Sequence, residues 1–467
     1  MSLTLLRRAT ANHRLLHPIS YSTHTLCPPT SDDPAVKTAV SILSHQRSKS
    51  RWSTLLSVFP GGLSGHQISQ IIIQIRNNPH LALRFFHFTT LRFPSNPPSL
   101  LSYATIIHTL ARARLKSRAQ TLVKDALLIS PDHFQLFKLL VDTYRVCDSA
   151  PFVFDFLIKS SLVDSNNLDS CLRILRVLKS RGINVDVATC NALISACCKR
   201  KGCFSGYDLY KSVFYEGGVL PNVHTFNQLM LSFHTSGLLD MVEEVWIEMV
   251  KRNCSPNCYS YTVLMEAYCE EGDINKAQNV WQELKLTGLE PDVVDYNTLI
   301  GGYCNAGEVD KGEELYKEMV LSGVDATCVT YQHLVNGYCL AQDADSAMLL
   351  YRDMCRKGYS PDAATVDAVV CVLCDKSYAM EALGFFTRVM DNADFVARET
   401  SYEKLIKGLC GVGKMEEALK LQAQMVGKGF PPNANIYGFF IDGYMKQGKP
   451  DVADRLRKEV TAMSAGV

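Results

Sequence analysis

The side chains best suited to chemistry form a column, nearly all of short polar residues, that recurs every 35 or 36 positions. A carboxamide carries both hydrogen-bond donors and an acceptor, so the column predicts recognition of a ligand's polar edge rather than bond-making chemistry. Asparagine is a poor residue for a helix interior, and a plain surface position would more often carry Lys, Glu or Ala. The alternative is a solvated helix start at which asparagine is harmless. The column reads Asp155, Asn191, Asn227, Thr262, Asn297, Gln332, Asp367, Glu403 and Gly438.

The sequence predicts no catalytic residue, no metal site and no cofactor. Its His and Asp residues are scattered without a shared face, and no glycine-rich phosphate loop follows a strand pattern. Cys371 and Cys374 form a CxxC pair, but no second CxxC and no nearby histidine complete a zinc site. The pair falls inside a predicted helix, which favours two packed thiols.

The elements that position the column repeat with a fixed period. Three units of 35 residues follow one another without a gap, at 258–292, 293–327 and 328–362. The tyrosines Tyr261, Tyr296 and Tyr331 occupy the same place in each unit. A period of this size is the signature of a solenoid. A single helix pair cannot bury its own apolar stripes, so the units are expected to stack.

Each unit is predicted to form two helices. Tyr296, Leu299 and Ile300 fall on one helical face, and a second apolar stripe runs from Ile274 to Leu284 in the unit before. The expected N-caps of the first helices are Asp295 and its equivalents Thr225, Ser260, Thr330, Thr365 and Ser401. The predicted fold is therefore an all-α, right-handed superhelical solenoid of stacked helix-turn-helix repeats, with the polar column facing its concave groove.

The repeats resemble pentatricopeptide repeats of the P class, which are RNA-binding helix pairs of plant organelle proteins. The unit at 293–327 carries the resemblance best, since it begins Val-Val-Asp-Tyr-Asn-Thr-Leu-Ile-Gly-Gly-Tyr-Cys-Asn-Ala-Gly. The resemblance implies that the chain binds single-stranded organelle RNA in its groove. It also implies a role in transcript stabilisation, processing, splicing or translation without catalysis of its own.

In this family the fifth and last residues of a unit together select one base. The second residue of a unit often packs against that base, and Val294 and Val329 fit this role. The resemblance implies pyrimidine readers at Asn191 with Asn222 and at Asn227 with Asn257, a guanine reader at Thr262 with Asp292, and a weaker pyrimidine pair at Asn297 with Thr327. Gln332 with Asp362, Asp367 with Arg398 and Glu403 with Asn433 depart from the usual combinations, so no base is assigned to them.

Net charge and the positions of the cysteines limit the functions that the sequence allows. The net charge of +1 over 467 residues is a weak footprint for a nucleic-acid binder. Six of the 17 cysteines hold the last apolar position of a first helix, which predicts reduced core thiols in a reducing compartment. They are Cys198, Cys269, Cys304, Cys339, Cys374 and Cys410. No apolar run is long enough to span a membrane, so no membrane partner is expected.

The chain order predicts four regions. Residues 1–30 contain arginines and no acidic residue, which is typical of an organelle transit peptide, with the mitochondrion favoured over the chloroplast. Residues 31–64 are a flexible linker region, and 65–150 are degenerate N-terminal helical repeats. The segment 132–150 is an extra apolar helix without a place in the repeat pattern. The array then runs 151–186, 187–222, 223–257, 258–292, 293–327, 328–362, 363–398, 399–433 and 434–467.

Two other functions remain open. A protein-binding scaffold of the tetratricopeptide kind would hold a peptide in the groove, but that family has a 34-residue period and lacks the recurring asparagine. An RNA-processing enzyme would need an additional domain, and the His-x-Glu of zinc deaminases is absent. The expected state is a monomer with other RNA-processing proteins as further partners.

Overall fold

The computed structural model describes residues 33–45, 50–93, 96–130, 132–163, 167–215, 219–390, 395 and 397–465. Across these ranges the regular structure consists of 25 α-helices and no strand, which confirms the all-α prediction. The predicted transit segment, 1–30, lies outside the described residues. The chain divides into two compact units, one ending at Leu193 and the other beginning at Ile194, and each is described by itself.

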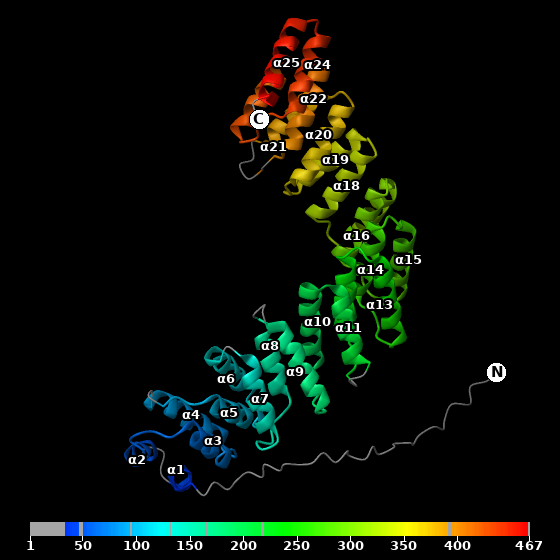
Figure 1. Ribbon diagram of the computed structural model, residues 1–467. Coiled ribbons are helices and arrows are strands. Elements are labelled where there is room, and N and C mark those ends of the chain that lie inside the picture. Colours follow the sequence, from blue (N-terminus) through cyan, green and yellow to red (C-terminus); the bar gives the residue numbers. More distant parts are fainter. Residues whose placement is uncertain are drawn as a thin grey trace, which may run out of the picture. The chain divides into compact units, whose positions relative to one another are not determined.

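The helices follow one another with short connections (Figure 1). The first unit contains α1 (Pro34–His45), α2 (Arg51–Val58), α3 (Gly65–Gln74), α4 (Pro79–Arg92), α5 (Leu100–Arg112), α6 (Lys116–Ile129), α7 (His133–Tyr144), α8 (Phe152–Ser161) and α9 (Leu168–Ser180). The division falls within α10 (Val187–Lys201). The second unit continues with α11 (Cys203–Phe214), α12 (Val223–His234), α13 (Leu239–Lys251), α14 (Cys258–Glu270), α15 (Ile274–Leu286), α16 (Val293–Asn305), α17 (Val309–Leu321), α18 (Cys328–Leu340), α19 (Ala344–Arg356), α20 (Ala363–Asp375), α21 (Ala379–Met390), α22 (Glu399–Gly411), α23 (Met415–Gly427), α24 (Ala434–Lys446) and α25 (Pro450–Ala465).

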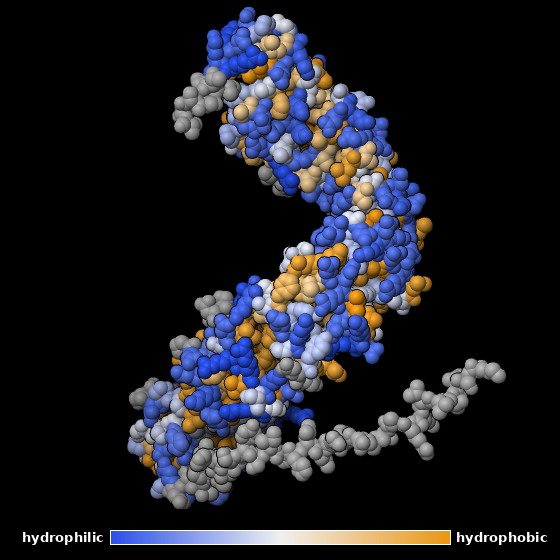
Figure 2. Space-filling model, turned by 45° about the vertical axis from the view of Figure 1, so that its right-hand side comes forward, coloured by the Kyte–Doolittle hydropathy of each residue, from blue (hydrophilic) through white to orange (hydrophobic). Residues whose placement is uncertain are grey.

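The helices of the second unit form a repeat solenoid. The first helix of each repeat packs on its own second helix and on the next first helix, so that α12, α14, α16 and α18 form a continuous stack. The predicted apolar stripes are buried, with Leu299 and Ile300 at 0% exposure and Trp281 at 1%. Polar residues cover much of the visible surface (Figure 2), as expected where each repeat buries its stripes against its neighbours.

The first helices begin three residues earlier than predicted. Asp292, and not Asp295, is the N-cap of α16, because its side chain accepts from the backbone N–H of Asp295 at 3.1 Å. Asp295 in turn accepts from the backbone N–H of Asp292 at 3.0 Å, which completes a capping box. The N-cap prediction was therefore wrong for this series, of which Thr225, Ser260, Asp295 and Thr330 are the second partners of capping boxes. The caps are Asn222, Asn257, Asp292, Thr327, Asp362 and Arg398.

Four of the six in-register cysteines, Cys269, Cys304, Cys374 and Cys410, fit against glycines of the next repeat. The Sγ of Cys304 lies 2.6 Å from the place where a Cβ on Gly337 would stand, and Cys269 occupies the same place at Gly302. Burial raises the pKa of the Cys304 thiol to about 12, so this thiol stays protonated at neutral pH. Cys304, Cys339 and Cys410 are buried, Cys198, Cys269 and Cys374 are half-buried, and all six are free thiols. The thiols thus act as small apolar groups that let first helices approach closely.

The N-terminal region repeats part of this plan. Segment 132–150, which had no predicted place, contributes α7, and α7 packs on α5 as α5 packs on α3. Ser99 caps α5 by accepting from the N–H of Ser102 at 3.3 Å. The first unit therefore also stacks helices, and α7 begins directly after the pair Pro131-Asp132.

We predict that Gly337→Ala lowers the stability of the second unit by about 1–3 kcal/mol, because the new methyl overlaps Cys304 in a packed layer. Gly384→Ala is the matched control, since Gly384 lies in α21 with nothing within 4 Å of its added Cβ. That change should stabilise the chain by about 0.5–1 kcal/mol. Urea unfolding of the full chain, followed by circular dichroism, measures both. Equal midpoints for the two variants would contradict the close Cys–Gly packing.

Candidate functional site

The predicted column lies at the seam between neighbouring repeats. Asn227, Thr262 and Asn297 stand in the first turns of α12, α14 and α16, and only 5%, 6% and 8% of each residue is exposed. The last residue of each repeat is the N-cap of the next first helix, and Asn257 and Asp292 are exposed. Each of these pairs therefore combines a buried fifth residue with an exposed cap.

Asn227 and Asn257 are held together by Ser260. Asn227 Nδ2 donates to Asn257 Oδ1 at 3.1 Å, and Asn227 Oδ1 accepts from the Ser260 hydroxyl at 2.6 Å. The same buried hydroxyl lies 2.8 Å from Asn257 Oδ1 and accepts from the Asn257 backbone N–H at 3.2 Å. Among the residues that the structure describes, nothing accepts from Asn257 Nδ2. The pair thus presents free N–H donors beside a fully used acceptor.

Thr262 belongs to a different arrangement, in which the free atom is an acceptor. Its hydroxyl lies 2.5 Å from Asp295 Oδ1 and 2.9 Å from the Cys258 carbonyl oxygen. Asp295 is 0% exposed, and this burial raises the pKa of its carboxyl, although the Thr262 hydrogen bond lowers it. Asp292 uses Oδ1 to cap α16. Its Oδ2 has no hydrogen-bond partner within the described part of the chain, so this pair offers a carboxylate oxygen.

Asn297 repeats the Asn227 pattern with a weaker cap contact. Its Nδ2 lies 3.4 Å from the Thr327 hydroxyl oxygen, and its Oδ1 accepts from the Thr330 hydroxyl at 2.7 Å. The Thr330 residue is 0% exposed. One N–H of Asn297 remains for a ligand.

The third residue of each repeat was missed as a positioning residue. It was expected only to cap its own helix, yet it binds the fifth residue of the preceding repeat. The sequence could have indicated this role, because the bonded residues are always 33 positions apart. The pairs are Asn227–Ser260, Thr262–Asp295 and Asn297–Thr330. In the first unit, the hydroxyls of Ser69 and Ser102 meet at 3.3 Å with this same spacing.

The other predicted residues are arranged less regularly. Gln332 is half-buried, and no hydrogen bond joins it to Asp362 in the described structure. Asp362 instead caps α20 by accepting from the backbone N–H of Thr365 at 2.9 Å. Asn191 is 3% exposed in the first unit, whereas Asn222 caps α12 in the second unit. Direct hydrogen bonds therefore join Asn227 with Asn257 and Asn297 with Thr327, while Thr262 reaches the Asp292 cap only through Asp295.

In the repeats of Asp367 and Glu403, to which no base was assigned, the polar side chains bond one another. Asp367 accepts from the hydroxyls of Ser401 and Thr400, the latter at 2.8 Å. Arg398 Nη1 stands 3.8 Å from the same carboxylate. Likewise, Glu403 accepts from the Asn433 side chain. These pairs present fewer free groups than the regular repeats do.

Apolar side chains flank the column on the exposed side. Val294 and Val329, the second residues of their repeats, are 54% and 45% exposed, and Tyr259 is 48% exposed. They lie in the first turns of α16, α18 and α14. An apolar group next to a row of polar atoms suits a ligand with flat faces and a polar edge.

The described residues offer no sign of metal chemistry. No group of three His, Cys, Asp or Glu side chains in them could hold a metal ion. Cys371 and Cys374 are free thiols, and burial raises the pKa of each. A membrane span is likewise not found among the helices that the structure describes.

We predict that Thr262→Val destabilises the second unit more at pH 7 than at pH 4. The lost hydroxyl bonds the Asp295 carboxylate, and a hydrogen bond to a charged group is worth about 1.5–3 kcal/mol. The Asp295 pKa is raised above 3.8 in the fold, so lowering the pH neutralises this carboxyl and reduces what the hydroxyl contributes. Thermal unfolding of wild type and variant at both pH values measures the difference. An equal loss at both would show that Asp295 is not charged beside Thr262.

Comparisons with known proteins identify the repeats. Family models described as "PPR repeat family" match residues 221–270, 291–340 and 328–375. A model described as "Pentatricopeptide repeat domain" matches 173–234, and one described as "PPR repeat" matches 259–289 and 400–430. The matched stretches contain the pairs Asn227–Asn257, Thr262–Asp292 and Asn297–Thr327.

Two relatives and one solved structure illustrate the similarity. A pentatricopeptide repeat-containing protein of Arabidopsis thaliana is 51% identical, with 98% of each chain covered. A second Arabidopsis protein of this kind, named as mitochondrial, is 30% identical over 42% of this chain and 36% of its own length. The crystal structure of the pentatricopeptide repeat protein PPR10 in complex with an 18-nt psaJ RNA element has a TM-score of 0.54 at 16% identity, covering 92% of this chain and 74% of that one. At that identity the likeness concerns the fold.

Proposed function

Because the chain belongs to the pentatricopeptide repeat family, we propose that it binds single-stranded RNA by sequence. The observation that carries this proposal is the recurring pair of a buried fifth residue and an exposed N-cap, whose unused polar atoms differ from repeat to repeat. Asn257 retains N–H donors, whereas Asp292 retains a carboxylate oxygen. Such differences at a fixed spacing suit a ligand that presents one polar edge per repeat.

The unused atoms support the predicted bases. The Asn227–Asn257 pair offers donors, and pyrimidine carbonyl oxygens are acceptors. Thr262 with Asp292 offers an acceptor, which suits the ring N–H and amino group of guanine. Asn297 with Thr327 offers one donor, in keeping with a weaker pyrimidine preference. The proposed core site is pyrimidine, pyrimidine, guanine, pyrimidine, read by the units that end at Asn222, Asn257, Asp292 and Thr327.

The proposal extends to the biological setting. We infer that the protein acts in an organelle, with the mitochondrion favoured, as a monomer and without catalysis of its own. It would stabilise a transcript or assist its processing, splicing or translation by occupying one site, together with other RNA-processing proteins. The acid-free segment 1–30 and a relative named as mitochondrial support the location. A peptide-binding scaffold is the competing function.

Thr262→Asn should shift one position of the bound RNA from guanine towards uracil. The carboxamide supplies a donor where the hydroxyl was, and the affinity for the original site should fall by about 1–3 kcal/mol, the scale of one good base contact. Selection from a randomised RNA pool, sequenced for wild type and variant, measures the shift.

Thr287→Asn is the matched control for this experiment. It makes the same exchange in the same repeat, at the end of α15, and should leave every base preference unchanged. An unaltered preference in Thr262→Asn would remove the case for base readout at this pair. A wild type that enriches no sequence would favour the peptide-binding scaffold.

A fusion of residues 1–60 to a fluorescent protein should enter mitochondria in plant cells, because an acid-free, arginine-containing start is typical of import signals. Arg7→Glu with Arg8→Glu should abolish import, since acidic residues are rare in such segments. Confocal microscopy with a mitochondrial marker reports the outcome. A cytosolic or nuclear signal from the unmodified fusion would refute the transit-peptide prediction, and a chloroplast signal would correct the compartment.

A further inference from the structure

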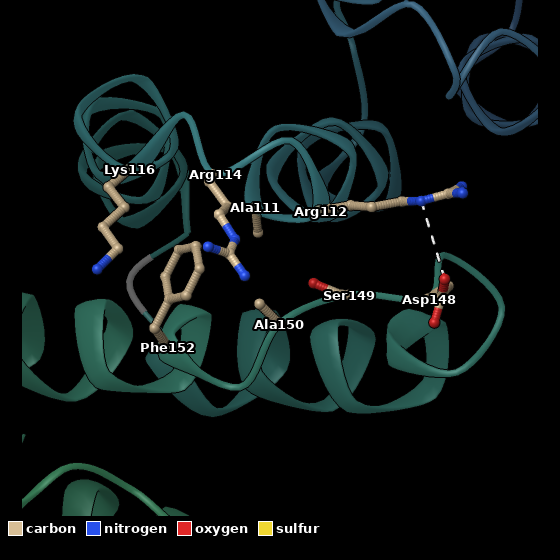
Figure 3. Close-up of a pocket in the computed structure, with 8 residues that line it drawn as sticks. All are labelled: Ala111, Arg112, Arg114, Lys116, Asp148, Ser149, Ala150 and Phe152. Atoms are coloured by element: carbon tan, nitrogen blue, oxygen red, sulfur yellow. Dashed lines mark ion pairs between the residues drawn. The ribbon is translucent and has the colours of Figure 1, made fainter.

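A basic pocket lies within the first unit, away from every residue of the predicted column. It measures about 490 Å³ and is formed by the turn from α5 to α6 together with the segment that leads into α8 (Figure 3). Its charged and polar lining consists of Arg112, Arg114, Lys116, Asp148 and Ser149, with Phe152 beside them. Three cations therefore face one carboxylate, which favours an anionic ligand.

The cations of the pocket are poorly neutralised by the protein. The Arg112 guanidinium is 3.8 Å from the highly exposed Asp148 carboxylate, and Lys116 lies over the Phe152 ring at 5.4 Å. The Arg114 guanidinium forms no ion pair or hydrogen bond within the described chain, and Figure 3 shows the Arg114 side chain directed towards Ala150. Its backbone has a φ of +58°, a conformation that arginine seldom adopts. The turn thus holds an unpaired guanidinium at the pocket.

The start of α6 has no side-chain cap, and one buried hydroxyl of the pocket has no hydrogen-bond partner. Helix α6 starts at Lys116 without a side-chain cap and without an acidic residue in its first turn. Cations there oppose the positive end of the helix dipole, so the first turn is arranged unfavourably unless an anion binds. The hydroxyl oxygen of Ser149 is buried and has no hydrogen-bond partner, although buried polar atoms are normally paired.

The N-terminal repeats that contain the pocket also carry an excess of basic residues. Residues 65–150 contain ten Lys and Arg against four Asp and Glu, whereas residues 151–467 contain 31 against 41. The array that carries the predicted base readers is therefore net acidic. A polyanion gains most of its affinity from cations that neutralise its phosphates, and the N-terminal repeats supply an excess of them.

We propose that this pocket binds a phosphate group of the RNA backbone, an inference that rests on the proposed RNA binding. Arg114 and Lys116 neutralise the phosphate, the first N–H groups of α6 face it, and Ser149 donates its hydroxyl. Arg112 contributes its charge while it remains close to Asp148. Phosphate contacts position a nucleic acid and carry no base information, so the pocket adds affinity without altering the preferred sequence.

The test compares two double variants of the full-length protein that change the net charge equally. Arg114→Gln with Lys116→Gln removes the pocket cations, while Lys124→Gln with Lys138→Gln removes two exposed cations of the same unit outside the pocket. The probe is a fluorescent RNA carrying the sequence that the wild type enriches. Anisotropy titrations from 50 to 200 mM KCl give the slope of log Kd against log salt.

The pocket variant should bind about tenfold more weakly at 100 mM salt. Its slope should fall by about 0.7, the contribution of one phosphate contact to a single strand. The affinity and slope of the control variant should change far less. The charge-preserving double variant Arg114→Lys with Lys116→Arg should keep the wild-type slope. All variants should enrich the same sequence from a randomised RNA pool. Circular dichroism establishes that each variant is folded.

The failures of the two proposals are distinguishable. Equal slopes in the pocket and control variants, with wild type bound tightly, would overturn the pocket alone and assign the effect to overall charge. A changed base preference in the pocket variant would overturn the assignment of the contact to the backbone. A wild type that binds no RNA would overturn the proposed function, and the pocket proposal with it.

Discussion

The structure depends on one interaction, the hydrogen bond between the fifth residue of a repeat and the third residue of the next. Asn227, Thr262 and Asn297 are nearly closed to solvent, and burying such groups is costly unless they are bonded. Their partners belong to the following helix at a constant spacing of 33 residues. These three repeats therefore satisfy their polar groups only when the neighbouring repeat docks in the correct register, and the apolar stripes are buried in the same step.

This arrangement ties stacking to the proposed recognition. The third residue also closes the capping box of its helix, so it orients the N-cap, which is the other half of each predicted pair. The hydrogen bonds between repeats use most of the polar atoms of these pairs. The atoms left for a ligand are N–H donors at Asn257 and one carboxylate oxygen at Asp292. A ligand meets groups whose directions were set by folding, so less conformational entropy is lost on binding.

The sequence was sufficient for the fold and for only part of the site. Period and apolar spacing specify helices and their buried faces, as Leu299 and Trp281 illustrate. The cap register was missed because Asp292 and Asp295 are both acceptors three residues apart, and only backbone geometry separates their reciprocal roles. The burial of Asn227 arises from a partner in the next repeat, which periodicity alone does not reveal. The pocket at Arg114 was not predicted because its lining comes from two segments about 35 residues apart in the sequence, 111–116 and 148–152.

The uneven charge of the chain bears on how a nearly neutral protein could bind a polyanion. Acidic residues in the array stabilise the stack itself: Glu318 bonds Tyr296 at 3.2 Å and pairs with Lys285 at 2.9 Å. Such carboxylates repel phosphates without selecting bases, so they lower affinity for all sequences alike. Under the proposed function, a base-reading array of this kind needs cations elsewhere, and it discriminates better if those cations are few, because nonspecific binding is almost wholly electrostatic. Concentrating basic residues in the degenerate repeats would separate affinity from sequence choice within one chain.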